Sequence, residues 1–282
     1  MYYIDIKNFR GMNIKLLYDS NNKFYAQVKY SEEIFSNYSK HSHETLNITA
    51  LKEGCMEVAV YLKETQYLKP KQLCFFNPQE VHLTKNMKKS SKGYYSLHLD
   101  KKWCIKIQKQ IFKKMKLSYL PISLNILSME SYYDAFVSMC DRVLREKESS
   151  SIHNEVSSFL GKIFTHYCKE IKNEIKRNEN NIPLETIENY IMENINEQLS
   201  LDDIAYEVGY NTSYIIRAFK KKYGLSPHAY MINKKINCAE NILAKNSDLN
   251  VSDIAYEFGF CDQSHFTRSF KRVFGISPNT YK

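Results

Sequence analysis

The chain has little glycine, proline or tryptophan, and it lacks a long apolar stretch. Among its 282 residues there are 8 Gly, 6 Pro and 1 Trp. This scarcity of glycine leaves little room for a glycine-rich loop that binds phosphate. No run of about 18 apolar residues occurs, so we expect no membrane-spanning helix. The first residues show no basic segment followed by an apolar one, so we expect no secretory signal.

The cysteines also exclude certain classes of protein. There are 7 of them, an odd number, and none forms a C-x-x-C pair. This pattern argues against a disulfide framework and against a zinc site. It predicts reduced thiols, which are typical of a cytosolic protein.

The charge is distributed unevenly along the chain. The net charge is +9, but residues 184–282 hold 11 basic and 12 acidic side chains, so the excess lies elsewhere. Within 184–282, the stretches 217–235 and 265–282 contain basic residues and no acidic one. Such stretches give local affinity for phosphate without a net charge. The same stretches are also typical of ordinary solvated helix faces.

A sequence repeat dominates the last third of the chain. Residues 204–210, Ile-Ala-Tyr-Glu-Val-Gly-Tyr, recur 50 positions later as Ile-Ala-Tyr-Glu-Phe-Gly-Phe at 254–260. Further matches lie 51 positions apart, namely Arg217 with Arg268 and Gly-Leu-Ser-Pro with Gly-Ile-Ser-Pro. Two copies of one supersecondary unit are therefore expected at about 195–230 and 245–281.

Each copy predicts a helix, a tight turn and a second helix. Ser200-x-x-Asp203 and Asn250-x-x-Asp253 are similar to capping boxes, and Gly209 and Gly259 mark the end of the first helix. Asn211, and Asp262 or a neighbour, are expected to cap the second helix. Each second helix has an apolar stripe at four-residue steps and a polar, basic opposite face, which is typical of a helix-turn-helix.

A third helix is expected between the copies. Ser226 and Pro227 suit its first positions, and Ala229, Ile232, Ile236, Ala239 and Leu243 form an apolar stripe. Residues 227–244 would span about 27 Å at about 1.5 Å per residue. A rod of that length holds two helix-turn-helix units about one DNA turn apart.

At these residues the chain resembles the AraC family of transcription regulators. The motif Ile-Ala-x-x-x-Gly-Phe-x-x-x-Ser-x-Phe-x-Arg-x-Phe-Lys-x-x-x-Gly-x-Ser-Pro-x-x-Tyr matches from Ile254 to Tyr281 without a gap, and the first copy matches less closely. Lys235 stands where arginine is usual in the bridging helix, and lysine lacks the bidentate fork of arginine. The resemblance covers about 100 residues and implies a DNA-binding activator of the bacterial cytosol, associated with the nucleoid, that acts with RNA polymerase.

The second helix of each copy supplies the expected DNA contacts. Arg217 and Arg268 are the candidates for guanine edges, and Ile216 is a candidate for a thymine methyl group, although it could instead pack internally. Further base-reading candidates are Ser213, Gln263, His265 and Thr267. The candidates for phosphate contacts are Lys220, Lys221, Lys271 and Arg272.

The first hundred residues predict short β-strands. Stretches such as 13–18, 24–30, 46–51, 56–62, 73–77 and 94–99 are separated by turn-forming residues, which predicts an antiparallel barrel or sandwich. With His41-Ser-His43 and a later Pro-x-x-x-His82, this region resembles the small cupin barrel that serves many AraC-family members as an effector domain.

The three histidines have more than one possible role. His41 and His43 would face the same side of a strand, and with His82 they could bind a divalent metal. However, Asn47 stands where a metal-binding cupin has glutamate. We therefore predict neither metal nor cofactor. Instead, we expect His41, His43 and His82 to line a pocket for a small-molecule effector, with purely structural roles as the alternative.

Helices are expected from about residue 101. One would place Ile107, Ile111 and Met115 on one face, and amphipathic helices follow at 132–146 and 155–175. They could simply cover the barrel. In the resembling family such helices often pair two subunits, which implies a homodimer. The polar stretch 176–181 is expected to be an interdomain linker.

Together these patterns predict an α+β protein with two domains. The expected boundaries are a cupin-like antiparallel β-barrel at 1–100, a helical dimerisation region at 101–175, a linker at 176–183 and an all-α double helix-turn-helix domain at 184–282. The expected function is transcription regulation by binding double-stranded DNA, without an enzymatic activity. The alternative is a metal-dependent cupin-type enzyme with a helical appendage, for which the sequence shows no full metal shell and no general acid or base.

Overall fold

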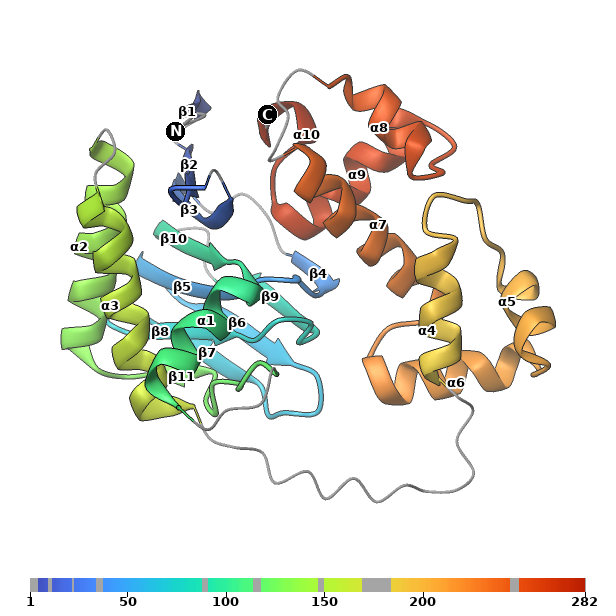
Figure 1. The fold of residues 1–282 in the computed structure, drawn as a ribbon, viewed down its shortest axis with the longest axis horizontal. Helices are drawn as coiled ribbons and strands as arrows, with labels where there is room; N and C mark the ends of the chain where they lie inside the picture. Colours follow the sequence, from blue (N-terminus) through green and yellow to red (C-terminus); the bar gives the residue numbers. More distant parts are fainter. Residues whose placement is uncertain are drawn as a thin grey trace. The chain divides into compact units, whose positions relative to one another are not determined.

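The protein divides into two compact units. The computed structural model describes residues 5–9, 12–21, 23–33, 38–87, 91–113, 118–146, 150–168, 184–243 and 249–281. The first unit consists of Met1–Asn37 and His43–Lys172, and the second of Tyr38–Ser42 and Asn173–Lys282. Figure 1 shows both sheets with helices α1–α3 in the first unit and helices α4–α10 in the second. The predicted linker at 176–183 lies outside the described residues.

The first unit is built on a large antiparallel sheet. Its strands run in the order β1-β2-β3-β10-β5-β8-β11. Their bounds are β1 Asp5–Phe9, β2 Met12–Tyr18, β3 Phe24–Glu33, β10 Lys92–Leu99, β5 Leu46–Glu53, β8 Leu73–Phe76 and β11 Ile126–Leu127. The strands expected from the sequence are confirmed within a few residues, and β1 and β11 are additional.

A second sheet packs on one face of the large sheet. It contains β9 (His82–Asn86), β6 (Met56–Val60) and β7 (Gln66–Leu68), in that order. Apolar side chains of both sheets form one buried cluster, to which the large sheet contributes Leu51 and Phe76 and the second sheet Met56 and Val58. The short strand β4 (Tyr38–His41) falls in the second unit.

Three helices cover the other face of the large sheet. They are α1 (Lys101–Ile111), α2 (Glu130–Arg145) and α3 (Ser150–Tyr167), and α3 contacts both of the others. Their apolar stripes join Val28, Ile48 and Leu97 of the sheet in one core. The α3 helix begins earlier than expected, at Ser150, and Met115 lies outside the described residues. In the part of the chain that the structure describes, none of the helices is long and apolar enough to cross a bilayer.

The second unit is helical, as the repeat predicts. Its helices are α4 (Leu184–Glu193), α5 (Leu201–Val208), α6 (Thr212–Tyr223), α7 (Pro227–Leu243), α8 (Val251–Glu257), α9 (Gln263–Phe274) and α10 (Pro278–Tyr281). The pairs α5–α6 and α8–α9 are the two helix-turn-helix units, and α7 joins them. The α4 helix was not expected from the sequence.

Most of the predicted caps are confirmed. Ser200 and Asp203 form a capping box at the start of α5, and Gly209 ends that helix in the left-handed region with a φ of 69°. The start of α8 differs from the expectation, because the side chain of Asn250 accepts from Ser252 N, at the second helical residue instead of the third. An Asn cap of this kind supplies a hydrogen-bond acceptor for a backbone N–H at the start of the helix, without a contribution from Asp253.

The two copies share an aromatic triad. Phe219, Tyr223 and Tyr230 form the first, with the Phe219 ring 4.8 Å from Tyr223 and 5.4 Å from Tyr230. In the second copy the Phe270 ring lies 4.8 Å from Phe274 and 5.4 Å from Tyr281. The repeat in the sequence is thus a repeat in the packing that sets the direction of each second helix.

Lys235 connects three segments of the second unit. Its buried Nζ donates to Glu197 O at 2.5 Å, in the connection from α4 to α5, and to Phe258 O at 2.8 Å, at the end of α8. Burial lowers the pKa of Lys235. Lysine replaces the arginine expected in the resembling family, and its ammonium group binds two backbone carbonyl groups.

We predict that Lys235→Met destabilises the second unit. Methionine retains the length of the side chain but leaves the two carbonyl groups without this donor, which costs about 1–3 kcal/mol of the free energy of unfolding. Native-state hydrogen exchange of the amides in α8 and α9 measures this loss in the full chain. The matched change Lys222→Met, at an exposed site on α6, should alter exchange by less than about 0.5 kcal/mol. Equal effects of the two changes would contradict the role of Lys235.

Candidate functional site

The α9 helix is positioned by a cap at its start and by aromatic packing along one side. The carboxylate of Asp262 accepts from the backbone N–H of His265 at 2.6 Å, and this bond lowers the pKa of Asp262. Phe266, Phe270 and Phe274 are buried at four-residue steps. The opposite side of α9 therefore faces outward.

The α6 helix repeats this arrangement. Asn211 Oδ1 accepts from Ser213 N at 2.8 Å, and Ile215 and Phe219 are buried. Gly224 ends the helix with a φ of 71°, as Gly275 ends α9 with a φ of 77°. Such a left-handed cap favours glycine, because a side chain there is strained.

The outward sides of the two helices carry matching residues, which we call the α6 surface and the α9 surface. The α6 surface consists of Ser213, Arg217, Lys220 and Lys221, all exposed. The α9 surface consists of Arg268, Lys271 and Arg272, also exposed, and Gln263 is exposed at the first residue of the helix. The pairs Arg217 with Arg268, Lys220 with Lys271 and Lys221 with Arg272 are each 51 residues apart. Seven of the eleven predicted DNA-contacting residues thus lie on these two surfaces, and an eighth, Gln263, is exposed at the start of α9.

The other three predicted residues are half-buried. They are Ile216, His265 and Thr267. The ring of His265 is held at the start of α9, where its Nδ1 lies 3.7 Å from Cys261 Sγ and its centroid 5.1 Å from that of Phe260. Partial burial leaves one edge of each side chain accessible and restricts its motion, which suits a residue that contacts a base.

Charge is segregated between the two helices of each unit. Neither α6 nor α9 contains an acidic residue. Exposed acids lie on α5 (Asp202, Asp203 and Glu207) and on α8 (Asp253 and Glu257), and the exposed Asp262 caps the start of α9. The field of each basic surface therefore attracts a polyanion, although the second unit as a whole is nearly neutral.

Two further exposed residues, which are not among the predicted DNA contacts, occupy positions on α6 and α9 that match predicted contacts. Ser264 is exposed on α9 at the position that matches Ser213, and Tyr214 is exposed at the position that matches His265. The Tyr214 ring lies 5.8 Å from that of Tyr210. The spacing of 51 residues was the signal that could have identified both.

Of the three predicted effector-binding histidines, the first unit holds two. His43 and His82 are buried, with ring centroids 5.4 Å apart, and the His43 centroid lies 4.8 Å from that of His98. His82 stacks on Phe76 at 3.8 Å, and burial lowers its pKa to about 4. His41 is buried in β4, where its Nδ1 lies 2.6 Å from Ser39 O. Asn47, which replaces the cupin glutamate, has its Nδ2 3.1 Å from His98 Nε2.

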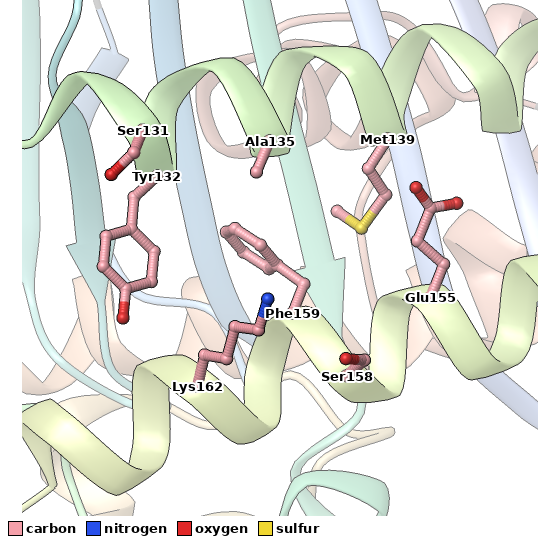
Figure 2. A pocket seen from close by; sticks show the side chains of 8 residues that line it. All are labelled: Ser131, Tyr132, Ala135, Met139, Glu155, Ser158, Phe159 and Lys162. Carbon is pink, nitrogen blue, oxygen red and sulfur yellow. The ribbon is translucent and has the colours of Figure 1, made fainter.

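A groove of about 460 Å³ lies between α2 and α3. Figure 2 shows Met139, Ala135 and Phe159 along it, with Ser131, Tyr132, Ser158, Glu155 and Lys162 around them. Glu155 forms an ion pair with Arg142 across the two helices. The sequence predicts a dimerisation region at these helices but gives no indication of a groove.

Comparisons with known proteins agree with this geometry. Residues 211–282 match the family model described as "Helix-turn-helix domain". The chain is 36% identical over 93 residues to the HTH-type transcriptional activator AarP of Providencia stuartii, covering 33% of this chain and 68% of AarP. It is 32% identical over 105 residues to the HTH-type transcriptional regulator ExsA of Pseudomonas aeruginosa, covering 37% of each chain. The chain covers less than two-fifths of the length of several curated relatives, ExsA among them.

A solved structure resembles almost the whole chain. ToxT from Vibrio cholerae O395 covers 97% of both chains with a TM-score of 0.54 and 12% sequence identity, which shows a shared fold. The expected α+β fold with two domains is therefore confirmed. The repeated helix-turn-helix pattern and the extent of the match to AarP together show that the chain belongs to the AraC family of transcription regulators.

Proposed function

We propose that the chain is a sequence-specific DNA-binding transcription activator that is controlled by a small-molecule effector in its first unit. The observation that carries this proposal is the pair of capped helices, α6 and α9, that present equivalent arginine and lysine residues outward. Two equivalent surfaces favour the recognition of two adjacent stretches of one duplex.

The residues divide into two kinds of contact. Arg217 and Arg268, near the middle of each surface, suit the O6 and N7 atoms of guanine, which a guanidinium group can bind with two hydrogen bonds. Ile216 suits a thymine methyl group. Other base edges would be read by Ser213, Gln263, His265 and Thr267, and the phosphates would be held by Lys220, Lys221, Lys271 and Arg272.

The spacing of the surfaces suits B-DNA. The α7 helix has 17 residues, which corresponds to about 26 Å. Two successive major-groove segments on one side of the duplex are about 34 Å apart, and the width of the two helix-turn-helix units makes up the difference. Bending of the duplex could bring the segments closer still.

The first unit supports the proposed control by a small-molecule effector. His43, His82 and His98 gather between its two sheets, where an effector would bind. One solved structure of the similar protein ToxT is described as bound to an unsaturated fatty acid. An effector is therefore compatible with this fold. No observation favours the enzyme alternative.

We further propose that the active form is a homodimer that pairs through the groove between α2 and α3. Ala135 is exposed in the middle of this groove, next to the buried side chains of Met139 and Phe159. An apolar floor with an ion pair at one end suits the same surface of a second copy. The protein would act in the cytosol, at promoters, together with RNA polymerase.

We predict that Arg268→Ala weakens binding to a selected DNA site by about 1–3 kcal/mol and relaxes the preference at one base pair, because a bidentate contact to guanine is lost. The site is first obtained by selecting bound duplexes from a random library with the full chain. Fluorescence anisotropy then measures affinity for this site, for its single-base variants and for a random duplex.

The matched control for this prediction is Arg272→Ala, one helical turn further along the α9 surface. Because Arg272 is assigned to phosphate, its loss should weaken binding to specific and random duplexes equally and reduce the slope against log salt by about 1. An Arg268→Ala variant that behaves in this same way would contradict base reading by Arg268.

We predict that Ala135→Glu converts the dimer into a monomer and raises its dissociation constant at least about tenfold, since a longer, charged side chain in the middle of the groove would block close packing against a second copy and would have to be desolvated. Analytical ultracentrifugation of the full chain measures this constant. The matched control is Gln110→Glu, an exposed site on α1 that should leave association unchanged. A wild-type monomer at all concentrations, or equal effects of both variants, would refute this interface.

A further inference from the structure

A short segment of the second unit comes from within the sequence of the first. Tyr38–Ser42, which is β4 and the residue after it, belongs to the second unit, whereas Met1–Asn37 and His43–Lys172 on either side belong to the first. The chain therefore passes between the two units at three places instead of one. We call Tyr38–Ser42 the inserted segment.

Ser42 of the inserted segment is bound by two asparagines of α7. Asn233 uses both ends of its amide group, since its Oδ1 accepts from Ser42 N at 3.1 Å and its Nδ2 donates to Ser42 O at 3.1 Å. The same Nδ2 lies 3.0 Å from Ser42 Oγ, and Asn237 Nδ2 donates to Ser42 O at 3.0 Å. Asn233 thus pairs with the backbone of Ser42 as a residue of a neighbouring antiparallel strand would.

Asparagine is an unusual residue at these two positions of α7. It is a poorer helix former than alanine or leucine, and a buried amide group is costly unless it has hydrogen bonds. Asn233 and Asn237 lie one turn apart on the same side of this helix of 17 residues, and each is 4% exposed. The hydrogen bonds to Ser42 account for both. We therefore interpret this side of α7 as a docking surface for the inserted segment.

The other end of the inserted segment reaches α9. Strand β4 contacts this helix, and Tyr38 lies against Gly275, the residue that ends it. A Cβ at Gly275 would collide with the ring and the hydroxyl group of Tyr38. The inserted segment thus contacts both α7 and α9, so it restrains the orientation of α9 relative to the bridging helix.

One peptide bond joins the inserted segment to the histidines of the first unit. Two adjacent carbonyl groups are bound by different units, because Ser42 O accepts from the asparagines of α7 and His43 O accepts from Gln79 N at 2.7 Å. The His43 ring lies beside that of His82. A shift of His43 is passed directly to Ser42, because the peptide bond between them is planar and stiff.

We propose that the inserted segment couples the first unit to the DNA-binding unit, and that its docking on α7 and α9 favours the arrangement that binds DNA. Docking reduces the freedom of α9 relative to α7, so less freedom is lost when both surfaces bind one duplex. The first unit then controls DNA binding by shifting the docking equilibrium. This inference rests on the proposed function and names a contact through which it is regulated.

The first test removes the α7 side of the contact in the full chain. Asn233→Ala/Asn237→Ala should weaken binding to the selected DNA site at least about fivefold, because the buried hydrogen bonds to Ser42 are lost. Alanine is the better helix former, so the change does not weaken α7 itself. Affinity for a random duplex depends on charge and should stay within about twofold of the wild-type value. Fluorescence anisotropy measures both affinities.

The matched control for this test is Asn241→Ala. Asn241 is exposed on α7, donates to Asn237 O within the helix, and should be replaceable without loss of DNA binding. Unchanged or stronger binding of the selected site by the double variant, an equal loss in Asn241→Ala, or an equal loss on the random duplex would each overturn the proposal. A wild-type chain that selects no DNA site would contradict the proposed function and this inference with it.

A second variant removes the contact from the side of the inserted segment. Tyr38→Ala lies outside both helix-turn-helix units and takes the ring away from Gly275. It should also weaken binding to the selected site and leave the random duplex unaffected. Combined with the two asparagine changes it should add little, because all three changes undo one docking contact. Full additivity, or no effect of Tyr38→Ala, would refute a single docking contact.

Hydrogen exchange of the Ser42 amide measures docking itself, because this N–H binds Asn233. The selected duplex should slow the exchange by the same factor by which docking raises DNA affinity, as linkage requires. His43→Ala, which changes the adjacent residue of the first unit, should speed the exchange. If either the duplex or His43→Ala leaves the exchange of this amide unchanged, the coupling is refuted.

Discussion

The second unit depends on the two hydrogen bonds of Lys235. Its ammonium group joins the backbone of Glu197, before α5, to that of Phe258, at the end of α8, and it projects from α7, which lies between the two repeats. At the same place Gly259 lies so close to the chain that a Cβ would come within 2.8 Å of Asn196 O, and its φ is 64°. The turn before α9 is therefore fixed against both α7 and the α4–α5 connection. Because the orientation of α9 follows from that turn, the direction of the α9 surface follows from it as well.

The sequence alone predicted this unit well because the same physical requirement appears twice. Each second helix needs an apolar stripe, a cap at its start and a glycine at its end. The spacing of 51 residues makes all three recognisable in both copies. The triads around Phe219 and Phe270 explain why those positions are aromatic. What the repeat did not predict was the α4 helix, which has no counterpart in the repeated motif. Its Glu188 receives hydrogen bonds from Tyr223 and Tyr230, a contact that no local pattern indicates.

The first unit shows where sequence patterns are insufficient. Strand β5 alternates Leu46, Asn47, Ile48 and Thr49, which usually indicates one buried and one solvated face. Here both faces are buried, because the second sheet covers the polar one. Periodicity therefore located the strand but gave no sign that Asn47 and Thr49 lie inside. The histidines form a motif that is visible in the sequence, whereas only the pairing of β3 with β10 shows that the buried Lys29 and Gln27 lie on the same face as His98.

The central claim is that one chain reads DNA with two equivalent surfaces, and hydroxyl-radical footprinting on the selected site tests it most directly. The wild-type chain should protect two successive segments on one side of the duplex, about 10 base pairs apart. Arg217→Ala should remove protection from one segment and Arg268→Ala from its neighbour, because each arginine belongs to a different helix-turn-helix unit. Loss of the same segment in both variants, or protection of a single segment that neither variant changes, would contradict the account.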